Sequence, residues 1–219
     1  MNITIVTNTS DNIKALTDVT LQNKLGYASR HGYDVLVQDF DYQRFNECIV
    51  DLMRSTLGFM RESDVVMTMG ADTMFTNWSF KIEDVLQAHP GKIVIAKEKT
   101  GWWPINDDVV IWPCTPKVIA FYERLIEDFP VWCEYPWRTQ THIWNLIQED
   151  PSVKDLIDLV EPEIMNQHPT KWQLGNWIVH FYNMELAQKL SLANEFQANW
   201  PDGNPVWKLK QNSVRPGVI

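Results

Sequence analysis

The sequence predicts an α/β fold: a single domain in which a mostly parallel central sheet is flanked by helices. Short continuous apolar runs, typical of strands buried on both faces, alternate with segments of helical periodicity through the first half of the chain. The length of 219 residues fits one well-filled domain, at roughly 150 residues per domain. No internal repeat and no clear linker divides the chain.

The first half of the chain contains five expected strands and two expected helices. One helix is expected over residues 12–31, between the first two strands. The other is expected over residues 45–61, where Ile49, Leu52 and Met53 have helical spacing. The expected strands are Ile3–Thr7, Tyr33–Gln38, Asp64–Met69, Lys92–Ala96 and Val109–Trp112.

The second half begins with a helix at Thr115-Pro116, where Thr is the N-cap and Pro takes the first helical position. This helix is expected to end before Pro130. A further helix is expected over residues 137–148, and a strand over residues 176–181. From Phe196 the chain is rich in Pro, Gly and Asn. We therefore expect a domain over residues 1–195 and a C-terminal tail or lid over residues 196–219.

Charge and composition narrow the classes of function. The 19 Lys and Arg against 28 Asp and Glu leave a net charge of −9, and an acidic chain repels the phosphates of nucleic acids. Nucleic acid is therefore an improbable partner. The 11 tryptophans are the unusual feature, because indole is a flat, amphipathic platform for ligands as well as a core residue.

Location is expected from what the sequence lacks. It contains neither a signal-peptide pattern nor an apolar run of the ~20 residues that span a bilayer. Cys48, Cys114 and Cys133 are widely spaced and form no CxxC pair, so we expect reduced thiols. The expectation is a soluble, cytoplasmic protein with no membrane anchor.

Ligands of open α/β sheets bind outside the carboxyl ends of the strands. Three segments lie there: Thr7–Ser10, Gly70–Thr73 and Gly101–Pro104. The first turn has neither GxGxxG nor GxxxxGK[ST], so dinucleotide-binding and P-loop functions are unsupported.

Asp72 and His180 each allow two interpretations. Asp72 follows a buried strand in a tight turn, where it could bind a divalent cation that holds a diphosphate. It could equally bond its own backbone or cap a helix. His180 lies in a short expected strand and could be a nitrogen ligand or a hydrogen-bonded structural residue. Sequence spacing does not pair the two.

Five short motifs, in this order, resemble the GT-A glycosyltransferases, whose sheet is Rossmann-like. The resemblance is to the retaining family of fungal galactosyl- and mannosyltransferases and xyloglucan xylosyltransferases, and it covers residues 4–181. The motifs are Asn23–Tyr33, Met69–Asn77, Ile105–Ile111, Arg138–Thr141 and Trp177–Phe181.

The resemblance implies an enzyme, a hexosyl- or pentosyltransferase. It would move a sugar from a nucleotide-sugar donor, a UDP-sugar, to an acceptor hydroxyl of a glycan or another molecule, with retention. Asp72 and His180 would hold a divalent metal, Mn²⁺ most readily. Gln140 would lie near the anomeric centre. The donor would be bound by Thr7, Asn8, Lys24, Tyr27, Ala71 and Asp72.

Three positions depart from the family pattern. Gly70 replaces the first Asp of Asp-x-Asp, Asp108 replaces a Gly, and Thr139 replaces an acid before Gln140. With Gly70, a contact that the family makes to the ribose or to the water shell of the metal is missing, which argues against strict metal dependence. Asp107 and Asp108 become candidate catalytic carboxylates beside the sugar.

The tryptophans are expected to divide between binding and packing. Trp102 and Trp103 lie between Gly101 and Pro104, which favours a loop in which one indole is a platform for the sugar or the acceptor. The alternative is that both cover the edge of the sheet. Trp137, like Trp132 and Trp144, is interpreted as packing.

Two other functions remain open. Gly70 and Thr139 would suit a non-catalytic relative that binds a nucleotide sugar or glycan without transferring it. A small transferase without an anchor could also act on a modified DNA base. The charge weighs against that acceptor, because no basic face accompanies the Asp72 turn.

Overall fold

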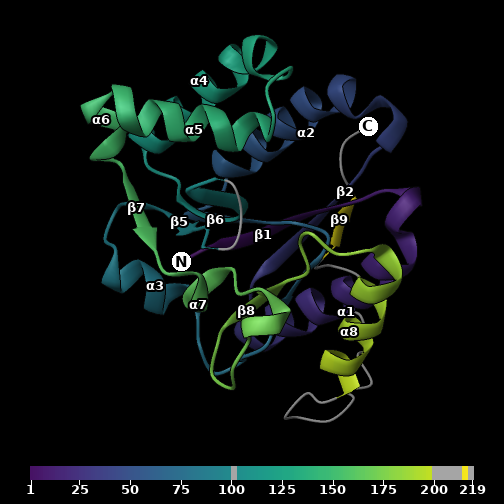
Figure 1. The fold of residues 1–219 in the computed structure, drawn as a ribbon. Helices are drawn as coiled ribbons and strands as arrows, with labels where there is room; N and C mark the ends of the chain where they lie inside the picture. Colours follow the sequence, from purple (N-terminus) through teal and green to yellow (C-terminus); the bar gives the residue numbers. More distant parts are fainter. Residues whose placement is uncertain (100–102, 199–213, 217–219) are drawn as a thin grey trace.

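The computed structural model describes residues 1–99, 103–198 and 214–216. A seven-stranded sheet runs through its middle in the order β7-β5-β6-β3-β1-β2-β9 (Figure 1). Its strands are β1 (Ile3–Thr9), β2 (Asp34–Asp39), β3 (Val65–Met69), β5 (Ile93–Lys97), β6 (Ile105–Pro113), β7 (Ile157–Val160) and β9 (Val214–Pro216).

The expected mostly parallel sheet is confirmed, with one strand reversed. Every neighbouring pair is parallel except those that β6 makes with β3 and β5, which are antiparallel. Only residues 98–104 separate β5 from β6, and a parallel connection needs a crossover of a dozen or more residues. The start of β6 therefore lies beside the carboxyl end of β3.

Helices cover both faces of the sheet (Figure 1). The helices α2, α4 and α5 lie on one face, and α1, α3, α7 and α8 lie on the other. Short 3₁₀ turns occur at residues 11–13, 42–44 and 169–171. The helices are α1 (Lys14–His31), α2 (Phe45–Met60), α3 (Ile82–Ala88), α4 (Pro116–Trp132), α5 (Arg138–Glu149), α6 (Pro151–Lys154), α7 (Pro162–Met165) and α8 (Leu186–Ala198).

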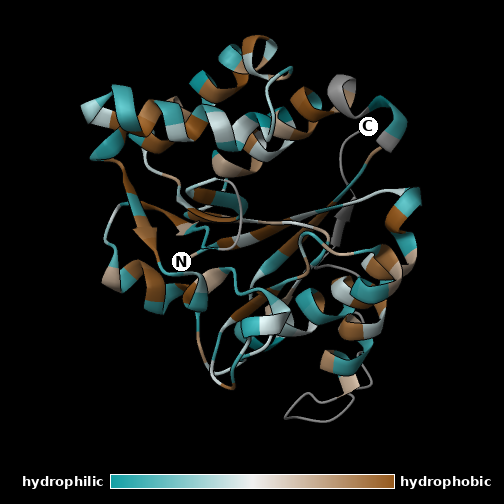
Figure 2. Cartoon of the chain, viewed as in Figure 1, coloured by the Kyte–Doolittle hydropathy of each residue, from teal (hydrophilic) through white to brown (hydrophobic). Residues whose placement is uncertain are grey.

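The core has two main halves because the central strands are apolar on both faces. In β1, Ile3 and Ile5 pack toward α1, whereas Val6 packs toward α2. In β5, Val94 packs on the α1 side of the sheet and Ile95 on the α2 side. Figure 2 shows the resulting apolar colouring along the sheet and the inner faces of the helices.

A second, two-stranded sheet brings the late part of the chain to the ligand-binding edge. The strands β4 (Thr73–Phe75) and β8 (Ile178–His180) pair antiparallel, and Thr73 lies opposite His180. This register places His180 beside the turn that ends at Thr73. Behind β4 and β8, the helices α1 and α8 close a third apolar cluster.

The expected end of one helix and the expected start of the tail differ in the structure. Helix α4 begins at the predicted Thr115 cap, whose hydroxyl accepts from the Val118 N–H at 3.4 Å, but it continues through Pro130 to Trp132. A proline in a last turn removes one hydrogen bond without breaking the helix behind it. Phe196 lies in α8, with its ring centroid 5.1 Å from that of Trp172. The boundary expected at residue 195 therefore falls inside this helix.

The remaining tail divides between described and undescribed parts. Residues 199–213 and 217–219 lie outside the described residues, whereas β9 pairs parallel with β2. Within the ranges that the structure covers, no helix combines the length and apolar character needed to cross a bilayer.

Candidate functional site

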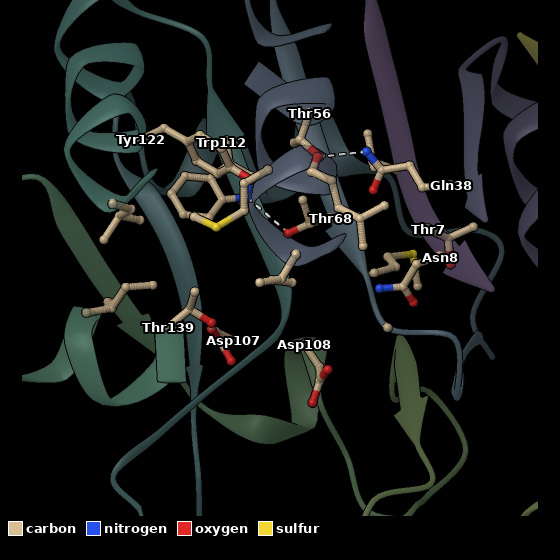
Figure 3. A pocket seen from close by; sticks show the side chains of 18 residues that line it. Thr7, Asn8, Gln38, Thr56, Thr68, Asp107, Asp108, Trp112, Tyr122 and Thr139 are labelled. Carbon is tan, nitrogen blue, oxygen red and sulfur yellow. Dashed lines mark hydrogen bonds between the residues drawn. The ribbon is translucent and has the colours of Figure 1, made fainter. Parts of the chain in front are cut away.

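A cavity of about 220 Å³ opens at the carboxyl ends of β1 and β3, on the face covered by α2, α4 and α5 (Figure 3). Its polar end is formed by Asn8, Gly70 and Asp108. Its apolar wall comes from the helices and includes Met53 and Tyr122. A mostly apolar hollow with a few convergent polar groups is typical of small-molecule sites.

Thr7 is the unsatisfied polar group of this cavity. The residue is 2% exposed, and its hydroxyl has no hydrogen-bond partner among the residues that the structure describes. Gln38 also lines the cavity, but its side chain is paired. Its amide donates to the Leu52 carbonyl at 2.9 Å and to the Thr56 hydroxyl at 3.2 Å. Buried polar groups in native proteins are nearly always paired, so Thr7 is available to a ligand.

Asp107 lies on the opposite side of the cavity from Thr7 and is held by the start of α5 (Figure 3). The Thr139 hydroxyl donates to Oδ2 of Asp107 at 2.6 Å. The Asp107 N–H donates to Oε1 of Gln140 at 3.3 Å. Burial and the neighbouring charge of Asp108 raise the pKa of Asp107 to about 7. Its carboxyl group can therefore accept or release a proton near neutrality.

The Gly70–Asp72 turn is held from below by helix α1. Lys24 is fully buried, and its Nζ donates to the Gly70 carbonyl at 2.8 Å and to the Ala71 carbonyl at 3.4 Å. The Thr20 hydroxyl also donates to the Ala71 carbonyl, at 2.5 Å. Burial lowers the pKa of Lys24 to about 7, although Asp72 and Asp108 oppose this shift. Lys24 thus positions the turn from inside the protein.

Each carboxylate oxygen of Asp72 faces a basic side chain. His180 Nε2 lies 3.2 Å from Oδ1, and Lys189 Nζ lies 2.6 Å from Oδ2. Burial alone would raise the pKa of Asp72, but the charges of His180 and Lys189 outweigh it and hold the pKa well below its usual range. Asp72 is therefore a permanent anion at this edge of the sheet.

His180 joins Asp72 to Asp108. Its Nδ1 lies 2.7 Å from Oδ1 of Asn166, and its Nε2 lies 3.5 Å from Oδ2 of Asp108. Burial opposes protonation, but the two carboxylates outweigh it and raise the pKa of His180. A Cβ added at Gly70 would lie 3.1 Å from Oδ1 of Asp108. The Asp108 carboxylate thus occupies space beside the position where the resembling family has its first Asp.

The structure brings together Asp72 and His180, the two residues that the resemblance implies as metal ligands. A carboxylate and an imidazole suit Mn²⁺ chemically, and the second oxygen of Asp72 is paired with Lys189. Across residues 1–99, 103–198 and 214–216, no group of three or more His, Cys, Asp or Glu side chains is placed to hold a metal ion. His180 and Lys189 are the basic side chains that contact Asp72.

Other predicted residues lie in different environments. Tyr27 is fully buried in the core, where its ring stacks on Phe75 at a centroid distance of 3.6 Å, so the structure does not bring it to the cavity. Trp102 falls outside the described residues. Trp103 packs partly into the core and stacks on Trp137, a residue that the sequence assigned to packing.

Sequence reasoning missed Lys189 and Asn166. Lys189 is 117 positions from Asp72, and nothing in the local pattern around it distinguishes it from a surface lysine of an ordinary helix. Asn166 follows α7 and contacts His180 only through the fold. No local signal could have found either residue.

No protein-family model and no curated protein matches the sequence. Solved structures do match. A glycosyltransferase involved in the glycosylation of the major capsid of PBCV-1 superposes with a TM-score of 0.71 at 14% identity, over 89% of this chain and 100% of that one. The chain has a glycosyltransferase fold.

A second likeness supports the same fold. The glycosyltransferase GlyE of Streptococcus pneumoniae TIGR4 superposes with a TM-score of 0.54 at 11% identity, over 95% of this chain and 67% of that one. Its apo form gives the same TM-score at 12% identity, over 89% of this chain and 63% of that one. These neighbours fit the predicted α/β architecture, and at such identities they establish fold rather than substrate.

Proposed function

We propose that the chain is a glycosyltransferase that moves a sugar from a nucleotide-sugar donor, a UDP-sugar, to an acceptor hydroxyl with retention. The observation that carries the proposal is the cavity at the carboxyl edge of the sheet, where the unpaired hydroxyl of Thr7 lies near a cluster of buried charges. The glycosyltransferase fold and the resemblance of the motifs support it.

In this proposal the donor lies along the carboxyl ends of β1 and β3. Thr7 and Asn8 contact the nucleoside, and Ala71 and Asp72 belong to the turn beside the diphosphate. Asp107, Thr139 and Gln140 border the space for the sugar. Lys24 acts indirectly, because its ammonium group positions the turn.

Catalysis then consists of positioning and of stabilising the leaving group. The bond between the anomeric carbon and the diphosphate oxygen breaks, and its electron pair leaves with the diphosphate. Lys189 offsets that negative charge, and so does His180 when it is protonated. The acceptor oxygen bonds to the anomeric carbon from the same face, and its proton passes to the departing phosphate oxygen.

Mn²⁺ is the alternative source of positive charge. Asp72 and His180 would hold the ion, and the ion would then neutralise the diphosphate. Lys189 would have to leave Asp72 first, because its ammonium group occupies one carboxylate oxygen. The two versions predict different responses to metal.

A thermal-shift screen of nucleotide sugars, with Mn²⁺ or with EDTA, tests the proposal. We expect one donor to raise the melting temperature of the wild type. Asp72→Ala should abolish that shift, because it removes the carboxylate that positions His180 and Lys189 and that would hold Mn²⁺. Asp18→Ala, on the exposed face of α1, is the matched control and should behave as the wild type. An equal shift with Asp72→Ala would contradict the assignment of this site.

Hydrolysis and transfer assays with the preferred donor separate the remaining functions. Tight donor binding without turnover on a broad acceptor panel would identify a non-catalytic relative. Transfer to modified bases in DNA would identify that acceptor. NMR of the product decides the stereochemistry: inversion would replace the same-face step, with Asp107 as the base that accepts the acceptor proton.

A further inference from the structure

An exposed indole marks the start of helix α5. Trp137 is 51% exposed, and its ring centroid lies 5.4 Å from that of Trp103, with the two planes 29° apart. Trp103 itself packs against the core. The result is a flat aromatic surface with a firm backing on one side and solvent on the other.

This surface is joined to the cavity by a short hydrogen-bonded path. The Trp137 carbonyl accepts from the Gln140 N–H at 2.9 Å, and Gln140 in turn accepts from the Asp107 N–H. Thr139, two residues after Trp137, donates to the Asp107 carboxylate and lines the cavity. Trp137 therefore stands two residues before the cavity-lining Thr139 that holds Asp107.

The backbone at this point is strained. Trp137 has φ 55° and Arg138 has φ 35°, a region that bulky side chains rarely adopt. The turn is nevertheless fixed, because the Arg138 N–H donates to the Tyr135 carbonyl at 3.1 Å and the Thr141 hydroxyl bonds to the Pro136 carbonyl. Strained residues that are held in place cluster at binding sites. Here the strained residues include the exposed Trp137 at the start of α5.

We propose that Trp137, supported by Trp103, is the platform on which a saccharide acceptor stacks before transfer. The inference rests on the proposed function and extends it, because it names the acceptor as a sugar. The apolar C–H face of a pyranose matches an indole face, while its hydroxyls remain free for polar neighbours such as Thr139 and Asp107.

The size of the surface favours a sugar over a protein. An aromatic side chain buries ~150–250 Å² at most, and Trp137 is half exposed, so it offers on the order of 100 Å². A stable protein interface needs ~800 Å² from each partner. Tyr135 and Val131 are exposed nearby, but three side chains still fall well short of that area.

The test compares two aromatic residues of the same turn. Trp137→Ala, Trp137→Phe and Tyr135→Ala are prepared in the full chain, and folding is checked by circular dichroism. Tyr135 is 50% exposed and is therefore a matched control for non-specific binding of glycans to an exposed aromatic side chain. Each variant is applied to an array of labelled glycans, and the glycan that the wild type binds best is then measured by calorimetry. The preferred nucleotide sugar is titrated in parallel.

We expect Trp137→Ala to weaken glycan binding at least about tenfold, Trp137→Phe to retain most of it, and Tyr135→Ala to leave it unchanged. Donor affinity should be the same in all three. The proposal is overturned if Trp137→Ala binds the glycan like the wild type, if Tyr135→Ala loses as much, or if no glycan binds the wild type. Glycan binding through Trp137 without any donor binding would instead refute the proposed function and leave the platform standing.

Discussion

Asp72 follows β3, and Asp107 lies near the start of β6, the strand that pairs with β3. The two carboxyl groups occupy one edge of the sheet in opposite surroundings. Asp72 is clamped between His180 and Lys189, which hold its pKa well below the usual range. Asp107 has the Thr139 hydroxyl and a neighbouring carboxylate, and its pKa is raised to about 7.

The difference shows how one edge can serve two needs of sugar transfer. A permanent ion cluster at Asp72 can stabilise a fixed negative charge without reorganising. A carboxyl group that titrates near pH 7 can exchange a proton with a substrate. The two groups come from adjacent strands, so the antiparallel entry of β6 is what brings them together.

The largest expected effect concerns the clamp, the pair of basic side chains His180 and Lys189 that contact Asp72. Lys189→Met should weaken binding of the preferred donor about 10- to 100-fold, because a hydrogen bond to a charged group contributes about 1.5–3 kcal/mol. Lys189→Arg should restore part of it. Calorimetry measures the affinity, and Lys14→Met, an exposed lysine paired with Asp18 on α1, is the control. Equal donor affinity in Lys189→Met would show that the clamp is only structural.

The second effect concerns pH. Because the folded pKa of Asp107 is about 7 and the unfolded value is 3.8, the folded state retains a proton that the unfolded state releases between these values. The contribution of Asp107 to the free energy of unfolding therefore falls as the pH rises from about 4 to about 7, and it does not return above pH 7. Asp107→Asn does not titrate. The melting temperature of this variant, relative to that of the wild type, should therefore rise as the pH is raised from 5 to 8. Each kcal/mol corresponds to roughly 2–4 °C.

Asp150→Asn is the control for that experiment. Hydrogen bonds from Ser152 and Arg124 lower the pKa of Asp150 to about 2, so its contribution is fully present above about pH 4. The difference between Asp150→Asn and the wild type should stay constant from pH 5 to pH 8. A constant difference for Asp107→Asn as well would remove the contrast between the two carboxylates.

The smallest expected effect concerns the unpaired hydroxyl of Thr7. Thr7→Val should change the free energy of unfolding by no more than about 0.5 kcal/mol, because no hydrogen bond is lost. The same change should weaken donor binding a few-fold. In Thr139→Val, by contrast, the bond to Asp107 is lost, and stability should fall by about 1 kcal/mol. Equal losses of stability in chemical denaturation would show that Thr7 is paired within the fold.

The sequence by itself determined the α/β class, the position of most strands, the Thr115 cap and the turn at Asp72. These features are local, since periodicity and turn chemistry act over a few residues. The reversal of β6 was not accessible, because the twelve residues 97–108 between the two expected strands would allow a crossover; in the structure β6 begins earlier, at Ile105. The continuation of α4 past Pro130 was not accessible either, because tertiary packing outweighs helix propensity in a last turn.

Only the tertiary structure decided which side chains meet. The register of β4 on β8 brings His180 to Asp72, and the docking of α8 on α1 brings Lys189 to the same carboxylate. The tertiary structure also buries Tyr27 in the core and leaves Trp137 exposed. These contacts join residues up to 117 positions apart. Their geometry depends on how whole elements pack, which no local pattern of residues encodes.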